Sequence, residues 1–105
     1  MFIDVTDENK IYIPNAFSPN NDNVNDVFMV YSNSAVESIE ELLVFDRWGE
    51  LVCQVKDGIP NYPAYGWDGT FNGQYMNTGV FIYMIRVRYF DGSTQVFKGD
   101  ITLIR

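Results

Sequence analysis

The clearest pattern in the chain is an alternation of apolar and polar residues in its last quarter. Across residues 80–90, one face of an extended segment would carry Phe81, Tyr83, Ile85, Val87 and Tyr89. The turn signal Asp91-Gly92 follows, and residues 94–104 return with a similar alternation. A period of two residues is typical of strands with one buried and one solvated face. The pattern therefore predicts a β-hairpin made of these two segments.

Shorter apolar runs predict further strands. They lie at residues 11–13, 27–31 and 39–48, and at 51–55 after a tight turn at Trp48-Gly49-Glu50. Turn signals at residues 68–69 and 72–73 bracket a pair of residues, and 57–67 reads as a long loop. Residues 34–41 also allow one helical turn, with Ser34 as its cap and Glu37 three residues later. Short strands, dense turns and the lack of a long helical pattern predict an all-β sandwich.

Residues 15–26 form a loop with seven Asn or Asp residues. These side chains hydrogen-bond their own backbone and tolerate left-handed conformations, so we expect an ordered, turn-rich loop. Its oxygens also suit calcium, through Asn20, Asp22, Asn25 and Asp26. The spacing is not that of an EF-hand, and the alternative is that these side chains cap turns. Removal of calcium would separate the two, since a ligand bound only to the native state raises its melting temperature.

Composition narrows the function. The 105 residues fit one domain, residues 1–105, and a net charge of −7 without a basic stripe argues against nucleic-acid binding. No apolar run is long enough to span a membrane as a helix, and no signal peptide is visible. Histidine is absent, and Cys53 lies in an apolar run where a buried structural role is expected. An enzyme is therefore not expected.

Four segments together identify a family. They are FSPNNDNVNDVF (17–28), FDRWGELV (45–52), GWDGTFNGQYMNTGVFIY (66–83) and KGDITLIR (98–105). In this order and spacing the chain, from about residue 11 to its last residue, resembles the gliding-motility-associated C-terminal domain. This is the type B sorting domain of the type IX secretion system of Bacteroidetes. One departure is Asn23, where the family has Gly; Asn also tolerates a left-handed position, so we expect the same loop shape.

The resemblance implies an immunoglobulin-like antiparallel β-sandwich of about seven strands, which is not an enzyme. It implies a secretion signal that directs a covalently joined upstream cargo through the periplasm and outer membrane to the cell surface or medium. The implied partners are type IX translocon components and outer-membrane β-barrel shuttle or receptor proteins. The alternative is a β-sandwich module of a surface adhesin that binds glycan or protein.

Most motif residues have a structural interpretation. Trp67 is expected to cover the end of the core and Asp68 to cap its turn, although Trp67 with Tyr62, Tyr65 and Tyr75 could also form a platform for a sugar. Trp48 is expected to pack on its hairpin, and Asp46 to cap the turn or pair with Arg47 in solvent. The residues expected to shape the fold are Phe17, Pro19, Asp22, Asn25, Asp26, Asp46, Trp48, Gly49, Trp67, Asp68 and Gly69.

The last strand is the predicted recognition surface. A terminal strand at a sheet edge offers unpaired backbone groups, to which a partner can add a strand. The alternative is that this strand only completes the sandwich, with its polar side chains keeping the outer face soluble. The residues predicted to contact the partner are Lys98, Gly99, Asp100, Thr102, Ile104 and Arg105.

Overall fold

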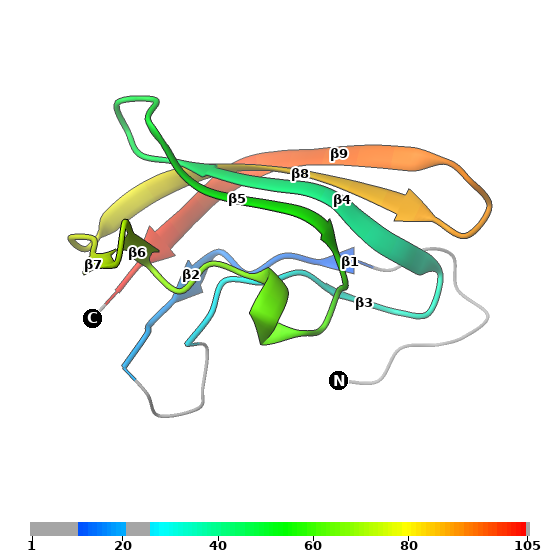
Figure 1. Cartoon of the computed structure of the whole chain (residues 1–105), viewed down its shortest axis with the longest axis horizontal. Helices are drawn as coiled ribbons and strands as arrows, with labels where there is room; N and C mark the ends of the chain where they lie inside the picture. The colour runs from blue at the N-terminus through cyan, green and yellow to red at the C-terminus, as the bar shows by residue number, and fades with distance from the viewer. Residues whose placement is uncertain (1–10, 21–25, 105) are drawn as a thin grey trace.

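The computed structural model describes residues 11–20 and 26–104, and these residues form nine β-strands and a short 3-10 turn (Figure 1). No helix of this described part is long and apolar enough to cross a membrane. The all-β prediction is confirmed, with nine strands instead of about seven. The elements are β1 (Ile11–Tyr12), β2 (Ala16–Phe17), β3 (Tyr31–Ser32), β4 (Val36–Phe45), β5 (Leu51–Gly58), η1 (Pro63–Tyr65), β6 (Thr70–Phe71), β7 (Gln74–Tyr75), β8 (Gly79–Tyr89) and β9 (Thr94–Leu103).

Five strands form the main sheet, in the order β2-β9-β8-β4-β5. The predicted hairpins β4-β5 and β8-β9 are antiparallel, and β4 also pairs antiparallel with β8. β2 is the exception, because it pairs with β9 in parallel. Parallel strands need a long crossover connection, and here almost the whole described chain separates the two. The expected antiparallel sandwich is therefore confirmed, with this pair as an exception.

Short strands and loops form the second layer, below the main sheet in Figure 1. In this layer β1 pairs with β3, β6 pairs with β7, and an isolated bridge joins Phe28 to Trp67. The core lies between the two layers, and the predicted inward face of β8 contributes to it. The fully buried large side chains are Phe17, Phe28, Val30, Ile39, Leu42, Val44, Ile85, Val87, Ile101 and Leu103.

The other face of the main sheet carries charged residues. On this face Arg86 Nε lies 2.9 Å from Glu40 Oε1, and Arg88 Nε lies 3.7 Å from Glu37 Oε1. Exposed pairs of this kind add little stability, about 0–1 kcal/mol each. They do neutralise both arginines, so the face is solvated without a concentrated positive charge.

The predicted helical turn at 34–41 is wrong, because β4 begins at Val36. Val36 and Ile39 pair with Tyr89 and Val87 of β8, and both side chains are buried. Local capping preference is a weak signal that tertiary packing overrides. The predicted strand 39–48 is accordingly displaced toward the N-terminus.

The region between 27 and 31 is also less regular than predicted. The structure has only the Phe28 bridge there, followed by β3, although the predicted strand covered the whole segment. Phe28 and Val30 are nevertheless completely buried. A loop that crosses the core buries these apolar residues without forming a strand. Their sequence pattern therefore indicated burial but did not specify the secondary structure.

Candidate functional site

The last strand, β9, places predicted recognition residues on its solvated face. Lys98 and Asp100 are exposed, and Thr102 is half-buried. Ile104, which follows the strand, is 49% exposed. The alternating pattern thus brings these four side chains to one face, as predicted. Arg105 lies outside the described residues.

β9 is an open edge along only part of its length. At its end the Thr102 N–H donates to Asn15 O at 3.0 Å, and the Ile104 N–H donates to Phe17 O at 2.9 Å. The expectation of an open terminal edge is therefore wrong at 102–104. The reason is that Phe17 is buried in the core and brings the β2 backbone against β9. No strand of the described chain pairs with the outer edge at residues 94–100.

The backbone groups at this open edge follow from strand geometry. In an antiparallel pair, residues alternate between those that hydrogen-bond the neighbour and those whose N–H and C=O point away from it. The N–H groups of Thr102 and Ile104 point to β2, away from β8. The register of β8 and β9 is continuous, so Val96, Lys98 and Asp100 also direct their N–H and C=O outward. These are the groups that an added strand would use.

Gly99 has a packing role that the sequence pattern did not reveal. It pairs with Tyr83 of β8, whose ring lies across it. A Cβ at position 99 would lie 2.6 Å from the Tyr83 hydroxyl oxygen, which is closer than van der Waals contact allows. Glycine at this predicted recognition position therefore has a structural reason of its own.

The turn between β4 and β5 holds an exposed tryptophan. Asp46 Oδ1 accepts the N–H groups of Trp48 at 2.8 Å and of Glu50 at 2.9 Å, and Gly49 has φ +86°, which favours glycine. Trp48 is 82% exposed, and the Arg47 guanidinium carbon lies 5.5 Å from its ring centre. The capping role of Asp46 is confirmed. The prediction that Trp48 packs on its hairpin is wrong, because backbone hydrogen bonds fix this turn without the indole.

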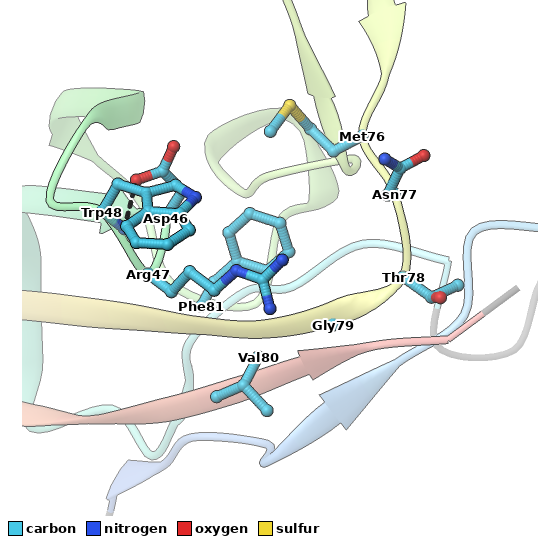
Figure 2. A pocket seen from close by; sticks show the side chains of 9 residues that line it. All are labelled: Asp46, Arg47, Trp48, Met76, Asn77, Thr78, Gly79, Val80 and Phe81. Atoms are coloured by element: carbon cyan, nitrogen blue, oxygen red, sulfur yellow. Dashed lines mark hydrogen bonds between the residues drawn. The ribbon is translucent and has the colours of Figure 1, made fainter.

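An open pocket of about 170 Å³ lies beside this turn (Figure 2). One wall is the turn itself, and the other is the segment that leads from β7 into β8. The sequence predicted neither the pocket nor the second wall. The only signal in the sequence was the D-R-W-G turn. Asp46 and Gly49 are needed for the conformation of this turn, whereas Arg47 and Trp48 have no such structural role. The lining residues are Asp46, Arg47, Trp48, Met76, Asn77, Thr78, Gly79, Val80 and Phe81.

Trp67 has the opposite environment. It is 2% exposed, and its ring centre lies 4.9 Å from that of Phe81. Its Nε1–H donates to Thr70 O at 2.9 Å, while Asp68 Oδ1 accepts the Thr70 N–H at 3.1 Å and its hydroxyl at 2.7 Å. The predicted roles of core cover and turn cap are confirmed. A sugar platform built on Trp67 is wrong, because the indole is buried.

Only part of the Asn/Asp-rich loop belongs to the described residues. There Asp26 Oδ1 accepts the Asn20 N–H at 3.0 Å across the loop, as a turn-capping side chain would. Asp22 and Asn25 lie outside the described residues, so the calcium hypothesis stays a prediction. Within residues 11–20 and 26–104, no group of three or more Cys, Asp or Glu side chains is arranged to hold a metal ion.

The single cysteine is a poor nucleophile. Cys53 lies half-buried in β5, packed against the core. Burial, and to a lesser extent the negative charge of Asp68, raise the pKa of its thiol to about 11. Since the thiolate is the reactive form, the thiol is inert at neutral pH.

We expect native Cys53 to react with a disulfide reagent at pH 8 at least about tenfold more slowly than the unfolded chain does, because an about 100-fold lower thiolate fraction is partly offset by a more nucleophilic thiolate. The thiol pKa is about 11 in the fold against 9.0 as its ordinary value, and each unit lowers the thiolate fraction about tenfold. Absorbance of the released thiolate, followed in buffer and in concentrated urea, measures the two rates. Equal rates would contradict a buried thiol.

The fold is that of a two-layer β-sandwich, and one comparison with solved structures agrees. The chain is similar to the crystal structure of CopC from Methylosinus trichosporium OB3b, with 15% sequence identity and a TM-score of 0.57. The similarity covers 90% of this chain and 88% of that one. At this identity the likeness concerns the fold alone. No curated protein matches the chain.

Residues 11–103 match the CHU_C type IX secretion signal domain family, and the chain belongs to this family. The match includes the D-R-W-G turn, the buried Trp67 and all of β9. The domain is therefore a sorting signal for type IX secretion, which interacts with the secretion machinery and marks a protein for export to the cell surface or medium.

Proposed function

We propose that β9 is the surface by which the type IX machinery recognises this domain. Its partners are translocon components and outer-membrane β-barrel shuttle or receptor proteins. The domain, residues 1–105, directs a cargo joined upstream from the periplasm through the outer membrane. It acts by binding and carries no catalytic activity.

The open edge of β9 is the observation that supports this proposal. Residues 94–100 direct backbone groups outward, and a partner strand can pair with them. Main-chain hydrogen bonds would supply affinity, and the exposed Lys98 and Asp100 side chains would supply specificity. Thr102 and Ile104 carry the same solvated face into the part of β9 whose backbone edge β2 covers.

No observation favours the alternative of an adhesin module that binds glycan or protein through its aromatic loops. Tyr62 and Tyr75 are 57% and 75% exposed. Trp67, the central ring of that surface, is buried in the core and is not available for stacking.

Export of a reporter tests the function. A signal peptide and a fluorescent protein are placed before residues 1–105 in a type IX-competent bacterium, with and without a working translocon. Fluorescence at the surface or in the medium only with the translocon is the expected result. Retention of the folded fusion in the periplasm of both strains would contradict the proposed function.

Lys98→Pro tests the edge of β9 specifically. Proline removes an N–H that points away from β8, and edge strands tolerate proline at such positions. We expect export of the reporter to fall about tenfold or more, which corresponds to the loss of one intermolecular hydrogen bond and its register. Lys98→Ala keeps the N–H and is the matched control for the side chain. Urea unfolding of both purified variants checks that the fold is retained. If export is unchanged in both variants, the open edge of β9 is not the recognition surface.

A further inference from the structure

We infer that Arg47, Trp48 and the adjoining pocket form a second contact site, which binds a carboxylate on a loop of a partner protein. This inference rests on the proposed function, in which the secretion machinery recognises the folded domain by direct binding. It assigns a role to the exposed residues of the D-R-W-G turn, which neither the core nor β9 explains.

The turn is constructed in a way that exposes Trp48. Its backbone is fixed by Asp46 Oδ1, which accepts two N–H groups, and by the Gly49 N–H, which donates to Asp46 O at 3.0 Å. The indole takes no part in these bonds and is 82% exposed. A large apolar ring exposed on a turn with a fixed backbone is typical of an interface centre, where Trp and Arg are the residues most often responsible for affinity.

The charge of Arg47 indicates what binds there. Arg86 and Arg88 both lie within 4 Å of glutamates, whereas Arg47 has neither an ion pair nor a hydrogen bond within the described part of the chain. Asp46 makes no ion pair with Arg47 among the described residues, and its Oδ1 accepts the turn amides. The guanidinium therefore keeps its planar fork of N–H donors, whose best partner is a carboxylate bound through both oxygens.

The pocket beside Arg47 supports the same ligand. Asn77 and Thr78 also line it, and their side chains carry an amide N–H and a hydroxyl that can donate hydrogen bonds (Figure 2). The volume of about 170 Å³ is below the roughly 300–1,000 Å³ of small-molecule sites. It suits one inserted side chain, so we assign the site to an Asp or Glu of a protein loop whose apolar neighbours cover the indole.

The pocket is also continuous with the end of β9. Gly79 and Val80, which line it, pair with Leu103 and Thr102. In Figure 1 the β4-β5 turn, β7 and the end of β9 all lie at the left end of the molecule. The pocket therefore adjoins the end of β9 that β2 covers, at residues 102–103. The net charge of −7 does not prevent contact with a carboxylate, because at physiological salt charges more than about 8 Å apart are largely screened.

The first test uses the exported reporter with two single variants, Arg47→Glu and Trp48→Ala. Each is expected to lower export about tenfold or more while urea unfolding stays unchanged, since both side chains are exposed. Phe90→Ala is the matched control, because Phe90 is 68% exposed at the opposite end of β8, and we expect its export to stay within about twofold. Unchanged export of Arg47→Glu and Trp48→Ala would overturn the inference. Loss of export already in the unaltered fusion would instead refute the proposed function.

The second test identifies the carboxylate. A photo-crosslinking residue in place of Glu50, which is exposed on the same turn, leaves Arg47 and Trp48 intact and captures the neighbouring segment. Mass spectrometry then locates that segment. Changing an Asp or Glu of that segment to Arg is expected to restore export of the Arg47→Glu variant at least about fivefold, because the swapped charges attract again. If no such charge reversal in the segment restores export of the Arg47→Glu variant, the inference is overturned. A cross-link to glycan or lipid alone would also overturn it.

Discussion

Replacing Trp67 with alanine is expected to lower the free energy of unfolding by about 3–5 kcal/mol, the cost of removing a large aromatic side chain from a core. The indole is 2% exposed and packs 4.9 Å from the Phe81 ring centre and 5.4 Å from that of Phe17. Its hydrogen bond to Thr70 O would also be lost, which leaves a carbonyl of β6 without this donor. The residual cavity lies where the loop layer meets the main sheet.

Urea denaturation followed by circular dichroism measures this loss. Trp48→Ala is the matched control, because Trp48 is 82% exposed, and surface substitutions usually change stability by about 0.5 kcal/mol or less. If Trp67→Ala leaves no folded protein, Trp67→Phe keeps part of the packing and should retain a cooperative transition below that of the native chain. Equal effects at the two tryptophans would contradict their opposite environments.

The long strands could be predicted because their pattern and their packing agree. Every second residue of β8 is apolar, and Phe81, Ile85, Val87 and Tyr89 are indeed buried. The Asp91-Gly92 signal placed the turn to β9, where Asp91 Oδ1 accepts the Ser93 N–H at 2.9 Å and Gly92 has φ +89°. In these hairpins a local signal specifies each element, and only neighbouring strands are needed to complete it.

The short strands could not be predicted in the same way, because their pairing depends on distant segments. β2 has two residues and pairs with the far end of the described chain. Nothing local to Ala16 and Phe17 indicates a parallel partner, and this pairing is what closes the edge of β9 at 102–104. The sequence thus predicted a fully open terminal edge, whereas the structure leaves open only residues 94–100.

For the same reason, the sequence predicted the solvated face of β9 but not the pocket, which depends on distant segments. The wet face of β9 follows from alternation alone, so Lys98, Asp100 and Thr102 were identifiable. The pocket beside Trp48 needs two loops that are distant in sequence, the turn after β4 and the segment before β8. Trp48 and Trp67 each lie in a turn sequence that contains Asp and Gly, yet only Trp67 packs against aromatic rings of the core. Their local sequence therefore did not show which tryptophan is buried and which is exposed.

Gly66→Ala is expected to cost about 3 kcal/mol, at the upper end of the usual range for overpacking. A Cβ at position 66 would lie 2.5 Å from Phe28 O and 2.5 Å from Val27 Cγ1. The carbonyl cannot move freely, because it accepts the Trp67 N–H at 2.9 Å in the bridge that joins the two loops of the second layer. Relief of the clash therefore has to separate Phe28 from Trp67.

Gly73→Ala is the informative comparison. Gly73 has φ +79°, but a Cβ there would meet no atom within 4 Å. The expected loss in the free energy of unfolding comes only from placing alanine in a left-handed conformation, about 1–2 kcal/mol. Urea unfolding of the two variants should therefore show the larger loss of stability for Gly66→Ala. Backbone angles alone would suggest the reverse, because the φ of Gly66 is negative, as in most residues. A larger loss at Gly73 would mean that the Phe28–Trp67 bridge yields easily, and that the loop layer is held by its side chains in the core rather than by this backbone contact.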